Sequence, residues 1–278
     1  MDWLTQHKLP VGEYSQAFVK FLQTHAKGFF DAFNALMENV IDGLLWALLN
    51  TPTLVVIALF LALTWVLQRK WQNCLIVFLG FLFILNQGYW KSTMESMTLI
   101  LLSCTTCMAI GVPVGIMAAH RPRFFASIRP VLDLMQTLPT FVYLIPAVIF
   151  FGLGMVPGLI ATVVFVLPAP IRATQLGIAA TPTALFEAAT AFGATPRQVL
   201  WKVELPSAFP QIMAGLTQSI MLSLSMVVIA AMVGANGLGV PVLRALGSSN
   251  AKLGFESGFV IVVVAILLER MLTMERKK

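Results

Sequence analysis

Charged residues are scarce in this sequence. They make up 11% of the 278 positions, whereas soluble domains carry roughly a quarter. Four long segments contain no Asp, Glu, Lys or Arg at all: 71–90, 96–120, 134–171 and 205–243. Each is as long as, or about twice as long as, the roughly 20 residues that cross a bilayer as a helix. The scarcity excludes an ordinary soluble domain and predicts a polytopic membrane protein.

The sequence also lacks the motifs that would make it an enzyme. No GxxxxGK[ST] phosphate loop occurs, so we expect the chain to bind no nucleotide itself. Its histidines show no metal-ligand spacing, and the CxxC of Cys104 and Cys107 lies in an apolar segment, which favours packing over redox or zinc chemistry. Basic residues gather at the ends of apolar segments rather than among aromatic residues, which speaks against a nucleic-acid partner. We therefore expect no catalytic residue, metal or bound cofactor.

The lengths of the apolar segments favour helices over the roughly ten-residue strands of a membrane barrel. The sequence predicts an all-α protein with about seven transmembrane helices, near residues 51–67, 72–88, 97–119, 134–151, 159–170, 209–233 and 256–272. Gly111, Pro113 and Gly115 are expected to loosen the third of them. Residues 1–50 form an amphipathic lead, which we expect to be retained and to lie at the membrane interface.

Lysine and arginine are unequally divided between the two sides of this topology. Twelve lie on one side, at 69–70, 121–129, 172–202 and from 270 onward, and six on the other. The positive-inside rule places the first group in the cytoplasm. We therefore predict an external N-terminus, a cytoplasmic C-terminus with a tail at 274–278, and a cytoplasmic loop at 181–206.

That loop is the most polar segment between the apolar ones, and its pattern predicts two short helices. Thr181 and Pro182 suit a helix cap and a first helical position. The helix is expected to run through Phe192 and to end at Gly193, where glycine adopts a left-handed conformation without a Cβ penalty.

A second helix is expected after this glycine. Thr195 and Gln198 have the spacing of a capping box, with Pro196 at the first helical position. We expect the helix to be stopped by Leu205, Pro206 and Pro210. Composition alone leaves open whether this loop is merely a capped, solvated connection or a docking surface.

The loop resembles the EAA loop of ABC importer permeases, EAAx(3)Gx(9)IxLP. The residues at matching intervals are Glu187, Ala188, Ala189, Gly193, Leu205 and Pro206, with Val203 where the pattern has Ile. Four segments further resemble the permease subunit of importers for glycine betaine, proline betaine and choline: 133–146, 167–174, 192–206 and 225–239. The resemblance covers most of the chain.

This resemblance implies a type I ABC importer transmembrane domain at 93–273, preceded by accessory helices at 51–92. It implies a homodimer of permeases in the bacterial inner membrane, two cytoplasmic ATPase subunits that hold ATP and Mg²⁺, and an external substrate-binding protein. Residues 187–192 would lie in a groove of the ATPase, with Gly193 at the corner and Arg197 setting the register. The choice among quaternary amines is expected to be made mainly in the binding protein.

Two further groups of residues are candidates for the translocation path of the substrate and for its external gate. Polar and aromatic residues cluster between prolines at Gln136, Thr140, Phe141 and Tyr143, and aromatic faces attract quaternary ammonium by cation–π interaction. A flexible external gate is the candidate role of Gly234, Asn236, Gly237 and Gly239. The alternatives are ordinary packing for the first group and a plain turn for the second.

Two other classes of transporter stay open at this point. An ion-coupled secondary transporter usually needs ionisable groups at membrane depth, and the acidic residues here fall at predicted ends or loops. A channel would conduct without any ATPase. His120, beside Arg121, is interpreted as an interfacial residue, with a pH sensor as the alternative.

Overall fold

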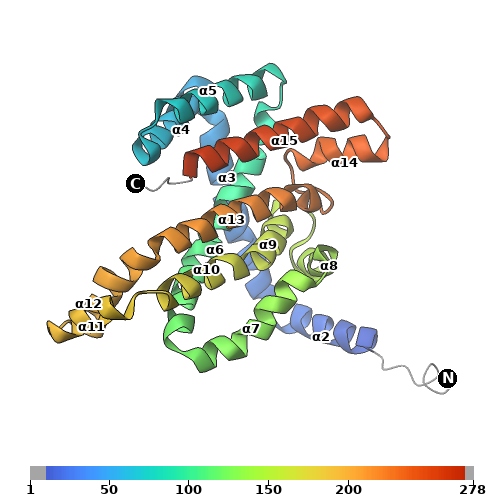
Figure 1. The fold of residues 1–278 in the computed structure, drawn as a ribbon. Coiled ribbons are helices and arrows are strands. Elements are labelled where there is room, and N and C mark those ends of the chain that lie inside the picture. The colour runs from blue at the N-terminus through green and yellow to red at the C-terminus, as the bar shows by residue number, and fades with distance from the viewer. Residues whose placement is uncertain (1–10, 273–278) are drawn as a thin grey trace, which may run out of the picture.

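The computed structural model describes residues 11–272, and helices joined by short turns account for nearly all of them (Figure 1). No strand occurs within these residues, so the predicted all-α class is confirmed. The predicted tail at 274–278 lies outside them. The helices are α2 (Val11–His25), α3 (Lys27–Asn50), α4 (Thr53–Gln68), α5 (Trp71–Asn86), α6 (Trp90–His120), α7 (Pro122–Thr137), α8 (Thr140–Phe151), α9 (Met155–Val166), α10 (Pro168–Ala179), α11 (Thr183–Ala191), α12 (Pro196–Val199), the π-helix η1 (Leu200–Glu204), α13 (Leu205–Ala231), α14 (Gly239–Gly247) and α15 (Ala251–Leu272).

Five helical segments of the described chain are long and apolar enough to cross a membrane: 27–50, 90–120, 155–179, 196–231 and 251–272. The bent pair α7 and α8 makes a sixth if it counts as one span. α4 and α5 coincide with the first two predicted spans, but each has 16 residues, fewer than the roughly 20 that cross a bilayer. The predicted span at 159–170 is longer in the structure, because α9 and α10 continue one another.

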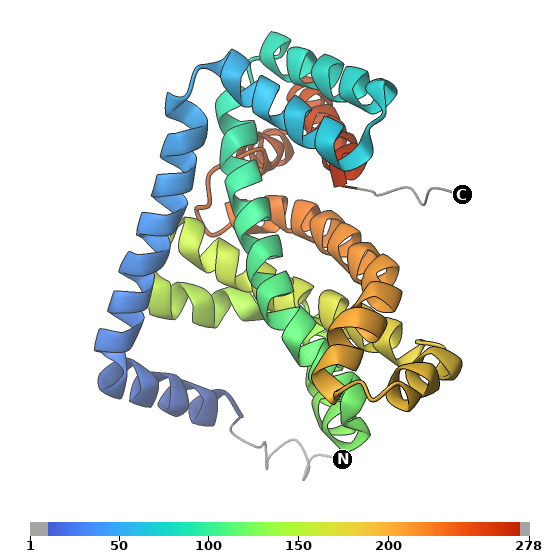
Figure 2. The ribbon, with the colours of Figure 1, turned by 90° about the vertical axis from the view of Figure 1, so that its left-hand side faces the viewer.

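The predicted lead contains one of these long helices, α3. Figures 1 and 2 show that α3 runs across α13 and α15 rather than alongside them. α3 packs on α8 and α9, where Phe30 stacks on Phe150 with ring centroids 4.4 Å apart, and most of its surface stays exposed. An interfacial position for the lead remains a prediction that fits this crossing.

Helices α6, α10 and α13 form the closely packed centre of the domain. A Cβ at Gly115 of α6 would lie 2.6 Å from the Cβ of Thr174 on α10, and one at Gly215 of α13 would lie 2.6 Å from that of Ala173. Small residues at these positions let the helix backbones approach closely, as is common between membrane helices. Gly111, Pro113 and Gly115 do not break α6, which runs from Trp90 to His120 with Pro113 inside it, and a loosening effect stays a prediction.

The predicted span at 134–151 is also wrong as a single helix. α7 and α8 are bent by 94° at Leu138 and Pro139. Leu138 is extended, with ψ 137°, because a residue that precedes proline is driven out of the helical region. The Tyr143 hydroxyl lies 2.7 Å from both the Met135 and the Leu138 carbonyl oxygens, so it donates to carbonyls that the end of α7 leaves without a helical partner.

Candidate functional site

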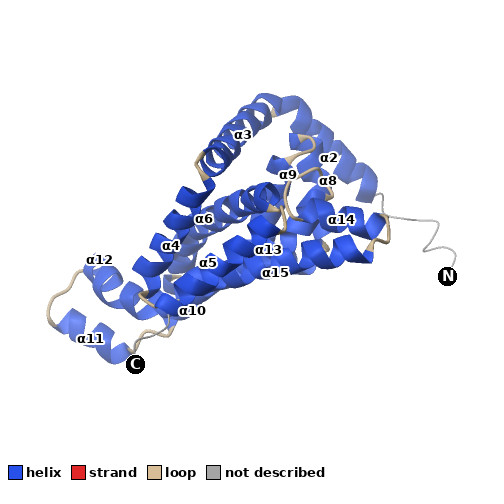
Figure 3. Ribbon diagram, turned by 90° about the horizontal axis from the view of Figure 1, so that it is seen from above, coloured by secondary structure: helices blue, strands red, loops and turns tan. Residues whose placement is uncertain are grey.

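The segment that contains α11, α12 and η1 protrudes from one end of the helical domain (Figures 1 and 3). α11 has no buried residue. Large apolar side chains of this segment face outward, and Phe192 is 93% exposed. The others are Leu185, Phe186 and Trp201. An exposed apolar patch of this kind on a polar loop is typical of a surface that binds another protein.

α11 ends as its sequence predicts. Gly193 has φ +77°, in the left-handed region that suits glycine. The Gly193 N–H donates to the Thr190 carbonyl at 2.9 Å, and the Ala194 N–H donates to the Ala189 carbonyl at 3.0 Å. These two bonds are a Schellman motif, which closes the last carbonyls of a helix. The change in chain direction at this corner therefore depends on the backbone geometry at Gly193.

The start of α11 differs by one residue from the prediction. The helix begins at Thr183, with Pro182 as its cap residue and no side-chain cap bond. The Leu185 N–H donates to the Pro182 carbonyl at 3.0 Å. Thr181 therefore does not cap α11, and its hydroxyl is buried without a hydrogen-bond partner.

The second helix of the loop starts with the predicted capping box. The Thr195 hydroxyl accepts from the Gln198 N–H at 3.4 Å, and Gln198 Oε1 accepts from the Thr195 N–H at 2.8 Å. Reciprocal bonds of this kind satisfy two donors at a helix start.

The prediction that Leu205, Pro206 and Pro210 stop this helix is wrong. The chain stays helical from Pro196 to Ala231. It does so through the π-helix η1, in which the Leu205 N–H donates to the carbonyl of Leu200, five residues back. This wider turn precedes Pro206, whose ring removes one backbone donor and crowds the carbonyl four residues back.

The predicted coupling residues lie together on this protrusion. Most of them are exposed: Glu187, Ala188, Gly193, Arg197 and Pro206. Ala189 and Leu205 are half-buried. The predicted path residues lie at the α7–α8 break, where Phe141 is 51% exposed and Gln136, Thr140 and Tyr143 are half-buried.

The predicted gate residues lie in the turn between α13 and α14, with Gly239 as the first residue of α14. Gly234 and Gly237 have φ values of +89° and +131°. The turn is bonded to its neighbours, since the Leu238 N–H donates to Ser96 Oγ on α6 at 2.8 Å and the Gly154 N–H donates to the Val233 carbonyl at 2.9 Å. Gly239 is buried against α13, whereas Asn236 is exposed. A gating role for this turn stays a prediction.

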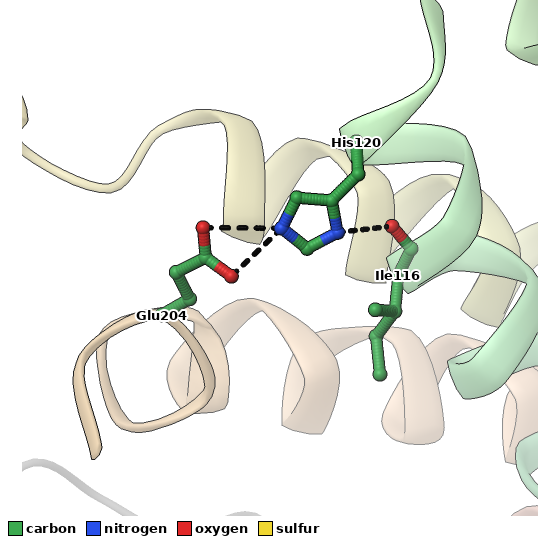
Figure 4. Close-up of polar contacts among 3 residues, drawn as sticks. All are labelled: Ile116, His120 and Glu204. Carbon is green, nitrogen blue, oxygen red and sulfur yellow. Dashed lines mark hydrogen bonds and ion pairs between the residues drawn. The ribbon is translucent and has the colours of Figure 1, made fainter. Parts of the chain in front are cut away.

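A contact between His120 and Glu204 was not anticipated from the sequence. The His120 Nε2 atom lies 2.9 Å from Oε2 of Glu204, at the junction of α6 and η1 (Figure 4). The two residues are 84 positions apart, so local spacing carries no sign of the pair. Within residues 11–272 no group of three or more His, Cys, Asp or Glu is arranged to hold a metal.

Known proteins with this sequence pattern are transport components. A family model described as "Binding-protein-dependent transport system inner membrane component" matches residues 111–272. The chain is 44% identical to a glycine betaine/carnitine transport permease protein of Listeria monocytogenes, over 97% of this chain and 96% of that protein. It is 42% identical to a glycine betaine transport system permease protein of Bacillus subtilis, over 95% and 93%. It is 40% identical to the glycine betaine/proline betaine transport system permease protein of Escherichia coli, over 97% and 81%.

The fold is also similar to a solved structure. A chain of the MetNI methionine ABC transporter in an inward-facing conformation matches with a TM-score of 0.58, over 65% of this chain and 91% of that one. The two sequences are 23% identical.

Proposed function

This chain belongs to the inner membrane components of binding-protein-dependent transport systems, and from that premise we propose that it forms the translocation path for glycine betaine or a related quaternary amine. The substrate class is supported by relatives at 40–44% identity that are named for glycine betaine, carnitine or proline betaine. Matches at lower identity include permeases named for choline and for trimethylamine N-oxide. All of these substrates are compact and carry a fully substituted nitrogen.

The observation that carries the mechanism is the protruding EAA loop. The chain has no phosphate loop, so ATP and Mg²⁺ belong to separate ATPase subunits. The exposed face of α11 with Glu187 and the Schellman corner at Gly193 supply the docking surface, and Arg197 fixes the register. ATPase closure would displace α11 and α12, and helices continuous with them would move in turn. Alternating access by movement of whole helical units is a common mechanism of membrane transporters.

The α7–α8 break is the proposed path. Broken membrane helices place backbone carbonyls and polar side chains in a water-accessible cavity. Phe141 offers an exposed aromatic face for a quaternary ammonium, which carries no N–H donor. Gln136 and Thr140 lie on either side of the break and could contact the carboxylate of a betaine.

The assembly we propose is a homodimer with an external substrate-binding protein. The N-terminus lies outside and the C-terminus inside, in agreement with the twelve Lys and Arg residues on the side of the EAA loop and six on the other. The binding protein delivers the amine on the side of the α13–α14 turn, where Gly234 and Gly237 would take part in an external gate.

The decisive experiment is uptake by proteoliposomes that contain this chain, its ATPase and its binding protein. Radiolabelled choline, glycine betaine, proline betaine and carnitine are each offered with and without ATP inside. ATP-dependent uptake of at least one amine is expected. Uptake driven by an ion gradient without ATP would support an ion-coupled transporter instead, and conduction by the purified chain alone would support a channel.

A further inference from the structure

His120 and Glu204 join two elements that lie far apart in the sequence. His120 is the last residue of α6, and Glu204 is the last residue of η1 (Figure 4). The Nε2 atom of His120 lies 2.9 Å and 3.1 Å from the two carboxylate oxygens, and its Nδ1 atom lies 3.0 Å from the Ile116 carbonyl. A carbonyl oxygen and a carboxylate only accept, so both ring nitrogens of His120 face acceptors. The separation of 2.9 Å between Nε2 and Oε2 is within ion-pair distance.

The pair lies at the edge of an apolar cluster, where the two side chains differ in exposure. The Glu204 side chain is 10% exposed, whereas that of His120 is 46% exposed. An apolar cluster adjoins it, in which Ile178, Ala208 and Ile212 pack against Ile116 and Leu205. A carboxylate shielded from water is strongly unfavourable without its partner. The end of α6 also favours a cation, because the negative end of the helix dipole lies there.

One member of the pair, Glu204, belongs to the π-helix η1. η1 follows α12 directly and leads into α13, and Glu204 is its last residue. A π-turn inserts one extra residue into a helix, and such turns are frequent at functional sites. Glu204 therefore lies where a displacement of α12 would be passed to α13, whereas the other end of the loop connects α11 to α10.

We propose that His120 and Glu204 are positioning residues that hold the η1 end of the EAA loop against α6, so that α6 and α13 move together when the ATPase displaces α11 and α12. The inference rests on the proposed function, in which an ATPase binds the loop. The apolar cluster below the pair keeps α6, α10 and α13 packed. The His120–Glu204 contact adds a polar link between α6 and η1, where a displacement of α12 would be passed to α13. Without it, ATP would still be hydrolysed, but less of the movement would reach α6.

The test measures ATP hydrolysis and amine uptake in the same proteoliposomes with the complete transporter. His120→Leu and Glu204→Gln are expected to lower the amine transported per ATP by about fivefold or more, the lower end of typical coupling between sites. ATPase binding and membrane level should stay near wild type. His120→Gln keeps an amide donor at about the reach of Nε2 and should restore most of the ratio. The matched control is His25→Leu on α2, an exposed histidine remote from the loop in sequence.

The pair can be separated from a general folding effect by a double variant. If the two residues act through each other, His120→Leu combined with Glu204→Gln lowers the ratio no further than either change alone. Unchanged ratios in both single variants, or additive losses in the double variant, would overturn the inference. These outcomes leave ATP-driven uptake by the wild-type complex intact, whereas failure of the proposed function would remove that uptake.

Discussion

Asp133 on α7 and Arg172 on α10 form an ion pair in which the Arg172 Nη2 atom lies 2.6 Å from Asp133 Oδ1. The pair ties the helix before the α7–α8 break to the central helix α10. Both side chains are partly exposed, at 52% for Asp133 and 39% for Arg172. Exposed ion pairs contribute little to stability, because water screens them and ordering the side chains costs entropy.

We therefore expect Arg172→Gln to lower the free energy of unfolding by less than about 1 kcal/mol. Thermal unfolding of the purified permease in detergent, followed by circular dichroism, measures the change. Transport is the more sensitive readout, since a looser α7 would displace the residues at the break. A large loss of thermal stability would contradict this expectation and would show that the Asp133–Arg172 pair stabilises the whole fold.

Changes on the EAA loop should separate docking from folding. Gly193→Leu forces a branched side chain into φ +77°, and Glu187→Lys reverses the charge of an exposed residue on α11. Both are expected to abolish uptake and to lower co-purification of the ATPase, while the permease remains in the membrane at normal levels as judged by immunoblot. Glu13→Lys, an exposed acid on α2, serves as the charge control. Normal uptake in either loop variant would remove the docking role.

Two aromatic residues at the α7–α8 break should differ in their effects. Phe141→Ala removes an exposed ring and is expected to raise the KM for the amine, because a cation–π contact contributes roughly 0.5–2 kcal/mol. Tyr143→Phe keeps the ring but removes the hydroxyl that donates to Met135 and Leu138, so it should alter the break and lower the maximal rate. Neither should weaken ATPase binding. Unaltered transport kinetics in both variants would show that Phe141 and Tyr143 only pack and do not contact the substrate.

Close packing of the central helices predicts a stability difference between two glycines. A Cβ at Gly215 would lie 2.6 Å from that of Ala173, so Gly215→Ala forces helices apart and should destabilise by about 1–3 kcal/mol. Gly258 on α15 has nothing within 4 Å of a built Cβ, and Gly258→Ala should be neutral or stabilise by up to about 1 kcal/mol. Melting temperatures of the two variants in the same detergent test the contrast.

Local patterns in the sequence predicted two features of the loop correctly. The turn at Gly193 and the capping box at Thr195 and Gln198 depend on residues within a few positions of one another, and both are present. The family expected from the EAA pattern and the importer fold are confirmed by the comparisons. Hydropathy located the apolar segments from residue 51 onward, but it did not identify α3 as a candidate span and could not distinguish a straight helix from a bent one.

The errors have two physical origins, local backbone geometry at prolines and contacts between distant segments. Pro206 was expected to end a helix, yet the helix continues past it and a π-turn precedes it. The His120–Glu204 pair depends on how α6 and η1 meet, which no spacing along one helix encodes. At Pro139 the opposite happened: the expected continuous span breaks, because the preceding residue is extended.

The continuity of the helix from Pro196 to Ala231 has a mechanical consequence. Its 36 residues span about 54 Å at 1.5 Å per residue, more than the thickness of the hydrocarbon core. One end carries the EAA loop's second half, and the other leads directly into the turn that is bonded to Ser96. A single continuous helix therefore connects the EAA loop with that turn, so a tilt imposed at the loop end is expected to displace the turn as well.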